Sequence, residues 1–428
     1  MGSIALDKET SAPATQNEKN PDFSKLRESA TDAIDGAERQ LRELNRQIHD
    51  NPELAYKEYQ AVENICRFLE SHDFGVQRAT YGLETSFTAE VGSSGPLVII
   101  CAEYDALPNI GHACGHNLIA TSSIAAFVGA TRTLTKSGLS GRIRLLGTPA
   151  EEGEGGKVKL IQAGAFKEDI AAAIMAHPLA RHQFEKGFSG LAGMRMIGSY
   201  KFRVEFRGKE AHAAGEPWNG VNALDAAVAA YNNISLLRQS MRPDERVHGV
   251  FEEGGTVPNI ITEYTRMNWY VRSPSMKRGK ALLDKVRKCC DAAALSTGCT
   301  LNYKDNPTYK DLRVNEPLSQ CYVNEMAYIG EQVTLRQDEC FTASTDMGKS
   351  APCNVSYEVP SFHGGFGIPT DPDVAQHHPR FAHFAGRDSA HEEAIKVGKG
   401  MALLALRVIT DPELIKDAKA DFDIPPDE

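Results

Sequence analysis

Short apolar runs that end in chemically reactive side chains recur through the first half of the chain. They are PLVIICAEYDALP at 96–108, GRIRLLGTPAEEG at 141–153 and IAAAIMAHP at 170–178. Each run predicts a strand buried on both faces, as in a parallel sheet. Apolar helices are expected between them, as at 118–135. This alternation predicts a doubly wound α/β sheet, which binds ligands at the carboxyl ends of its strands.

The pattern changes near residue 199. SYKFRVEFRG at 199–208 alternates apolar and polar residues, as a half-exposed antiparallel strand does. Across 199–306 the patterns predict strand, helix, strand, strand, helix and strand, which is the order of a ferredoxin-like α+β domain. From about 314 the first pattern returns. We therefore expect an α/β domain with a mixed sheet in two parts, 28–196 and 309–428, and an inserted domain at 197–308.

Composition narrows the class of protein. The chain has 428 residues, a net charge of −10 and no apolar run near the length of a membrane span. These values argue against nucleic acid or a membrane as the main partner. Nine cysteines, an odd number in a long chain, predict reduced thiols. Residues 1–27 are polar and predict a disordered leader on a cytoplasmic protein.

The stretch GHACGH at 111–116 places His112, Cys114 and His116 at alternate positions. Such residues share one side of an extended loop but do not share a helix face. Asn117 is expected to cap the helix that follows. A thiol and imidazoles are ligands suited to zinc. Taken alone, the motif favours a buried thiol beside hydrogen-bonded histidines over a metal site.

Further polar groups fall at expected strand ends, and each also has a purely structural interpretation as an acidic loop, a core histidine or a polar loop. These groups are Glu151, Glu152, His177, His377, His378 and His383. Together with Cys114 and His116 they would suit two divalent ions that share a water. Of the adjacent glutamates, one can bind metal while the other serves as a base. Asp105 is placed to fix the tautomer of a ligand imidazole.

The ordered motifs resemble a family of zinc metallopeptidases and amidohydrolases that includes aminoacylases, glutamate-type carboxypeptidases and plant auxin-conjugate hydrolases. Within it they most resemble the Xaa-Arg (β-alanyl-lysine) dipeptidase branch. The resemblance covers about residues 30–410. It rests on AEYDALP, NIGHACGHN, GTPAEEG, MAHP, GKEAHAAGEPWNGVNALDA, GGTVPNII and ASTDMG.

This resemblance implies a hydrolase that cleaves a dipeptide or N-acyl amino acid with two metal ions, Zn²⁺ being expected and Mn²⁺ or Co²⁺ possible alternatives. The implied general base is Glu151. The implied metal ligands are Cys114, His116, Glu152, His177 and His377. His378 remains a rival to His377, because the family has Ser or Thr at that position.

The resemblance also implies two roles for the inserted domain. It would form a lid over the catalytic domain and would mediate dimerisation. The resemblance further implies that His212 reaches the reacting carbonyl across a homodimer. Asn259 and Arg266 are the implied substrate-binding residues, with Arg266 for the substrate carboxylate.

One departure from the family pattern is the segment KSAPC, Lys349–Cys353, between ASTDMG and NVS. It leaves substrate preference open. Two other functions therefore remain as alternatives: an enzyme that forms or rearranges a C–N bond, and a metal-binding scaffold without activity.

Overall fold

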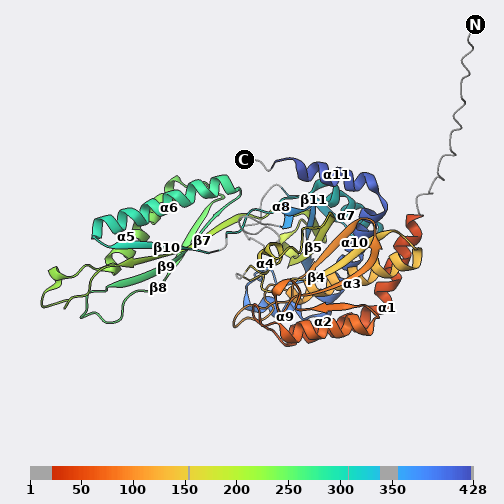
Figure 1. Cartoon of the computed structure of the whole chain (residues 1–428), viewed down its shortest axis with the longest axis horizontal. Coiled ribbons are helices and arrows are strands. Elements are labelled where there is room, and N and C mark those ends of the chain that lie inside the picture. Colours follow the sequence, from red (N-terminus) through yellow and green to blue (C-terminus); the bar gives the residue numbers. More distant parts are fainter. Residues whose placement is uncertain (1–21, 153–154, 307, 338–354, 426–428) are drawn as a thin grey trace, which may run out of the picture.

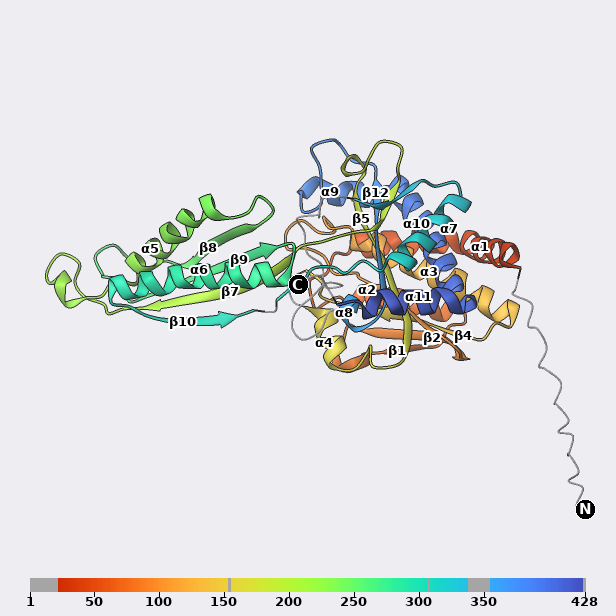
Figure 2. The same cartoon turned by 90° about the horizontal axis from the view of Figure 1, so that it is seen from above.

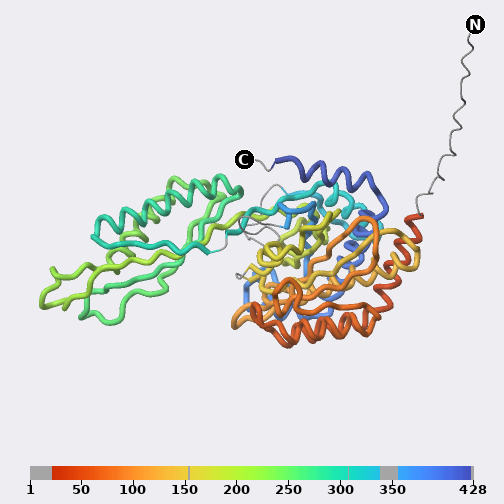
Figure 3. Tube along the Cα trace, in the orientation of Figure 1, coloured from red at the N-terminus to blue at the C-terminus, as the bar shows by residue number. Residues whose placement is uncertain are grey.

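The computed structural model describes residues 22–152, 155–306, 308–337 and 355–425. Figure 1 shows two sheets, each with its own helices, that lie side by side along the long axis of the molecule. In the tube of Figure 3 both the red and the blue ends of the chain belong to the larger body, and the green segment forms the smaller one. The chain therefore leaves the larger body once and returns to it.

The larger body is built on an eight-stranded mixed sheet of order β1-β2-β4-β3-β5-β12-β6-β11. Its centre is parallel, since β3 pairs in parallel with β4 and β5, and β5 with β12. The strands are β1 Val76–Arg78, β2 Phe87–Ser94, β3 Leu97–Ala102, β4 Gly141–Gly147, β5 Ile170–Ala180, β6 Gly190–Gly193, β11 Val333–Arg336 and β12 Ser361–Ile368.

Helices cover both faces of this sheet. Along β3 the residues alternate between two cores, with Val98 and Ile100 in the one beneath α1, α3 and α10, and Leu97 and Ile99 in the one beneath α4 and α8. The α-helices are α1 Phe23–Asp50, α2 Tyr59–Ser71, α3 His116–Ser137, α4 Gly156–Gln162, α7 Glu316–Tyr328, α8 Val355–Glu358, α9 Pro379–Ala385, α10 Asp388–Thr410 and α11 Pro412–Asp423. The predicted doubly wound α/β fold is confirmed.

The smaller body is a four-stranded antiparallel sheet of order β10-β7-β9-β8, with two helices on one face. Its elements are β7 Gly198–Arg207, α5 Ala223–Leu236, β8 Arg246–Glu253, β9 Tyr264–Ser273, α6 Met276–Thr297 and β10 Thr300–Asp305. Across both bodies, the described residues also contain four short 3-10 segments: Thr80–Gly82, Arg181–Gln183, Pro217–Asn219 and Leu237–Ser240. The element order of the smaller body is the one expected for a ferredoxin-like insertion.

Two local expectations need correction. Helix α1 begins at Phe23, where Asp22 accepts the Ser24 N–H as N-cap, so the leader expected for 1–27 is too long at its end. Asn117 does not cap α3, because the helix already begins at His116 after Gly115. The Asn117 amide instead donates to Asn45 and to the carbonyl of Ala385. The Lys349–Cys353 segment lies outside the described residues.

Candidate metal centre

The Cys114–His116 loop turns sharply into helix α3. Gly115 has φ +82°, and a Cβ there would come within 2.7 Å of Cγ of Pro178 and 3.3 Å of the Phe381 ring. Only glycine satisfies both the left-handed backbone and this close packing. The turn makes His116 the first helical residue and leaves both Cys114 and His116 buried.

The loop after β4 carries the two glutamates. Thr148 continues the sheet pattern by donating its N–H to Ala102 at 2.8 Å. Ala150 then has φ +58°, a left-handed conformation that is uncommon outside glycine. This reversal places the carboxylate of Glu151 3.9 Å, and that of Glu152 3.8 Å, from Nε2 of His116.

Two histidines complete the cluster. His177 was expected at the end of its strand, and it lies within β5, three residues before that strand ends. His377 also has a left-handed φ, +65°, and its N–H donates to Ala113 at 2.9 Å. His378, the rival, accepts the Arg380 N–H as N-cap of α9. His383, further along that helix, accepts a hydrogen bond from Arg387.

All five predicted metal ligands come together in overlapping groups whose ligand atoms lie within 4.8 Å of one another. Sγ of Cys114 is 3.5 Å from Nε2 of His177, and Nε2 of His377 is 3.4 Å from Oε1 of Glu152. The groups are Cys114–His116–His177, Cys114–Glu152–His377 and His116–Glu151–Glu152. Since Cys114, His116 and Glu152 each belong to two groups, the arrangement suits two neighbouring ions.

Asp105 contacts both His116 and the backbone of the loop that carries Glu152. One carboxylate oxygen contacts Nδ1 of His116 at 3.0 Å, and the other accepts the Glu152 N–H at 2.9 Å. Burial alone would raise the pKa of Asp105, but the charge and hydrogen bond of His116, with the Glu152 and Glu151 N–H groups, hold it below its usual value. An ionised Asp105 keeps the proton of His116 on Nδ1 and leaves Nε2 free to bind an ion.

The unsatisfied atoms of the cluster fit a bound cation. Nε2 of His116 and Oε1 of Glu152 are buried and make no hydrogen bond. Buried polar atoms without a partner are rare, so a ligand is expected at these atoms. Burial also raises the pKa of the Cys114 thiol and lowers that of His177 to about 4. A cation would favour the thiolate and bind the neutral imidazole.

Sequence reasoning missed a second set of buried polar residues under the cluster. Glu103 is ion-paired with Lys157, both are fully buried, and its other oxygen is 3.6 Å from Nε2 of His116. His363 stacks on His177 at 6.3 Å between ring centroids. Glu103 lies inside the AEYDALP motif and could have been found there. Nothing local distinguishes Lys157 or His363, because only the fold buries them.

The predicted residues of the inserted segment lie elsewhere. His212 and Asn259 are exposed neighbours, linked by the His212–Ile260 bridge and by the Ala213 N–H, which donates to the Asn259 carbonyl at 3.0 Å. They lie beyond the Arg207–Tyr264 end of the sheet, whereas its opposite end leads to the larger body (Figure 2). The structure brings these two together but not to the metal cluster.

Arg266 is already engaged. Its guanidinium contacts Glu252 at 2.7 Å and Glu253 at 2.8 Å. A substrate carboxylate would have to compete with these two side chains for it.

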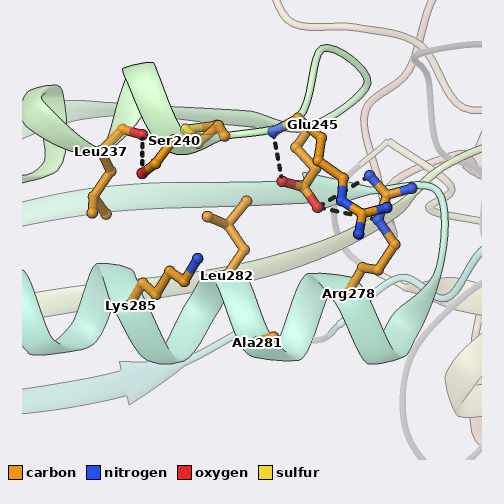
Figure 4. Close-up of a pocket in the computed structure, with 9 residues that line it drawn as sticks. Leu237, Ser240, Glu245, Arg278, Ala281, Leu282 and Lys285 are labelled. Atoms are coloured by element: carbon orange, nitrogen blue, oxygen red, sulfur yellow. Dashed lines mark hydrogen bonds and ion pairs between the residues drawn. The ribbon is translucent and has the colours of Figure 1, made fainter.

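A cavity of about 180 Å³ in the smaller body is separate from the cluster. It lies between the 237–245 segment and α6, and Figure 4 shows its polar wall occupied by the Arg278–Glu245 contact of 3.1 Å. None of the predicted site residues lines it.

Comparison with known proteins establishes the family. Residues 99–403 match the model of peptidase family M20/M25/M40. The chain is 39% identical over 415 residues to the Xaa-Arg dipeptidase of Mus musculus, covering 93% of this chain and 92% of that protein. It is 27% identical to the N-acetyl-L-cysteine deacetylase of Bacillus subtilis, over 80% of this chain and 83% of the relative. The chain therefore belongs to the M20 peptidase family, whose members hydrolyse peptide and amide bonds.

Solved structures share the fold. A dinuclear metal-binding peptidase of the M20 family from Bacillus subtilis superposes with a TM-score of 0.61 at 20% identity, covering 87% of this chain and 99% of its own. A Staphylococcus aureus protein described as a putative aminohydrolase gives a TM-score of 0.68 at 19% identity, over 87% and 98%. The expected metal-dependent hydrolase of amide bonds agrees with these relatives. No described helix has the length and apolar character needed to span a membrane.

Proposed function

We propose that the protein is a dipeptidase that uses two divalent metal ions to hydrolyse the amide bond of a dipeptide or N-acyl amino acid. The supporting observation is the convergence of five ligand side chains at Nε2 of His116 and Oε1 of Glu152, two buried atoms that make no hydrogen bond. The ligands would be Cys114, His116, Glu152, His177 and His377. A thiolate with imidazoles favours Zn²⁺ over Mn²⁺ or Co²⁺.

The ions would supply Lewis acidity, which polarises a carbonyl and lowers the pKa of water. Glu151 would accept the proton of the attacking water and deliver it to the leaving nitrogen. Glu151 is 7% exposed and shares a candidate ligand group with His116 and Glu152, so its carboxylate lies beside the proposed ions. Asp105 would hold His116 in the tautomer that leaves Nε2 available.

His212 would donate a hydrogen bond to the developing oxyanion. Because it lies at the far end of the smaller sheet, it would serve the cluster of a second copy or act after the lid closes. Asn259, its neighbour, would contact the same substrate. Arg266 would bind the substrate carboxylate after exchanging Glu252 or Glu253 for it.

A homodimer through the smaller body is supported by the surface of that body. In its described sheet, β8 is an edge strand, and edge strands favour pairing. Large apolar side chains of the smaller body are exposed, which favours a protein partner. They are Trp218 at 75%, Val228 at 45%, Tyr231 at 38%, Leu236 at 78% and Val250 at 60%.

We also place the protein in the cytoplasm, where thiols stay reduced. Seven cysteines of the described residues are free, among them the proposed ligand Cys114.

The test combines metal analysis with an amide-hydrolysis screen. Protein loaded with Zn²⁺, Mn²⁺ or Co²⁺ is assayed on dipeptides that end in Arg, Lys, Ala or Glu, and on N-acyl amino acids. We expect about two ions per chain and hydrolysis of at least one substrate class. Glu151→Gln should keep its metal and lose about a hundredfold or more in rate. Glu152→Gln is the matched control, since it should lose metal as well. Stoichiometric metal without any hydrolysis would contradict the proposal.

A further inference from the structure

The segment Glu53–Glu58, between α1 and α2, contacts two of the loops that carry candidate site residues. The Glu53 carbonyl accepts the N–H of Ala106, next to Asp105, at 2.8 Å. Oε1 of Glu58 accepts the N–H of Ala150, next to Glu151, at 2.8 Å. The segment therefore links two strand ends, after β3 and after β4.

Glu58 contacts the backbone at two residues in the left-handed conformation. Ala150 has φ +58°, and the same Oε1 accepts the N–H of Tyr56 at 3.0 Å, a residue with φ +60°. Left-handed conformations at residues other than glycine persist when surrounding contacts hold them. One buried oxygen thus holds two left-handed residues that are 94 positions apart in the sequence (150 minus 56).

The Glu58 carboxylate does not cap helix α2, which begins at the next residue. The side chain of Glu58 makes no cap hydrogen bond to α2, although its backbone carbonyl accepts the Val62 N–H. The side chain of Glu53 caps α2 instead, because it accepts the N–H groups of Gln60 and Ala61. Glu58 is 0% exposed, and its carboxylate is directed to the Ala150 turn instead.

Asp105 contacts the backbone of both glutamates of the catalytic loop. It accepts the Glu152 N–H at 2.9 Å, and the Glu151 N–H also helps to lower the pKa of Asp105. The position of Glu151 depends in addition on the turn before it, because a rotation at Ala150 changes the direction of the next side chain. Loss of the Glu58 contact should therefore displace Glu151 while Glu152 keeps its place.

Building on the proposed function, we propose that Glu58 is a positioning residue that aims the carboxylate of Glu151 by fixing the left-handed turn at Ala150. It belongs to none of the candidate ligand groups. Its effect should be on the proton-transfer step and not on metal binding.

The test uses the metal-loaded full chain. Glu58→Leu removes the acceptor at similar size, whereas Glu58→Gln keeps a carbonyl oxygen for both N–H groups. We expect Glu58→Leu to lower kcat by about ten- to a hundredfold with KM within about twofold, because small misplacement of a catalytic group has effects of that size. Metal content should not change. Glu58→Gln should recover most of kcat.

Glu53→Leu is the matched control within the same segment. It removes the α2 cap and should lower Tm while leaving kcat near the wild-type value. Should Glu58→Leu fail to fold, Glu58→Asp provides the second variant, since it stays acidic but withdraws the oxygen by one methylene. A folded Glu58→Leu or Glu58→Asp with wild-type kcat would overturn the proposal.

A double-mutant cycle separates positioning from a general structural effect. If Glu58 acts through Glu151, adding Glu58→Leu to Glu151→Gln should lower kcat by less than about twofold further. An undiminished loss in that background would overturn the inference and leave the proposed function intact. If Glu151→Gln itself kept the wild-type rate, both the proposed function and the role of Glu58 would fail.

Discussion

The two bodies of the molecule hold their candidate functional residues in opposite ways. At the strand ends of the larger sheet, Cys114, His116 and Glu151 are at least nine-tenths buried and lie within one network. At the far end of the smaller sheet, His212 is exposed, and its Nδ1 accepts only neighbouring N–H groups, those of Ala214 at 3.2 Å and Gly215 at 3.0 Å. The first region is already assembled within one chain, whereas under the proposed function the second would need a partner or a closure to act.

The largest effect should come from the buried region. Cys114→Ala removes a ligand shared by two groups of the cluster. Metal affinity should fall by about a thousandfold or more, since a four-ligand zinc site supplies roughly 10–16 kcal/mol in total. Elemental analysis after dialysis measures this loss, and activity should fall with it. If the variant retains full metal and full rate, Cys114 is an ordinary core thiol.

His212→Ala tests the exposed region. It should leave metal content and Tm unchanged but lower kcat by about 10²–10³-fold, the range for one oxyanion donor. Mixing it with Glu151→Gln should restore part of the activity, because one site of a mixed dimer combines an intact Glu151 with an intact His212. Mixed dimers demonstrated by a tag pull-down yet inactive would rule out action across the interface.

Asp105→Asn tests the link within the buried region. The amide cannot fix the His116 tautomer as a carboxylate does, so metal affinity should fall about 10–100-fold, the usual range for such supporting residues. A chelator competition titration measures it. Asp388→Asn is a suitable control, because that residue pairs with Arg42 and Arg46 on the surface. Equal affinities for the two variants would mean that Asp105 has no supporting role.

The smallest expected effect is on the unfolding free energy of the larger body at acidic pH. Burial, reinforced by nearby Arg42, lowers the pKa of His391 to about 4 in the folded chain. Between about pH 6.5 and 4 the unfolded chain therefore binds one proton more than the folded chain. The free energy of unfolding thus keeps its full value above about pH 6.5 and decreases as the pH falls.

His391→Gln should therefore reduce the slope of unfolding free energy against pH by at most about 1.4 kcal/mol per pH unit in that window. Urea unfolding with a chelator present excludes metal release as the cause. An unchanged slope would mean that His391 is as easily protonated in the folded chain as in the unfolded one.

The sequence alone determined the elements and most of the chemistry. Apolar runs at 97–102, 141–147 and 170–176 became β3, β4 and most of β5, because burial on both faces requires continuous apolar residues. The alternating stretch at 199–207 became β7 of a separate antiparallel sheet. The resemblance of the ordered motifs to the family implied the five ligand residues, and the structure brings their side chains together.

Only the tertiary structure decided which polar residues have partners far away in the chain. It placed His377 in a candidate ligand group, whereas His378 caps α9. It buried Lys157 against Glu103, and it brought Glu58 to Ala150, 92 positions later. It also kept His212 at the end of its sheet remote from the cluster. Local sequence carries little signal for such contacts, because burial and hydrogen bonding at these positions depend on how distant elements pack together.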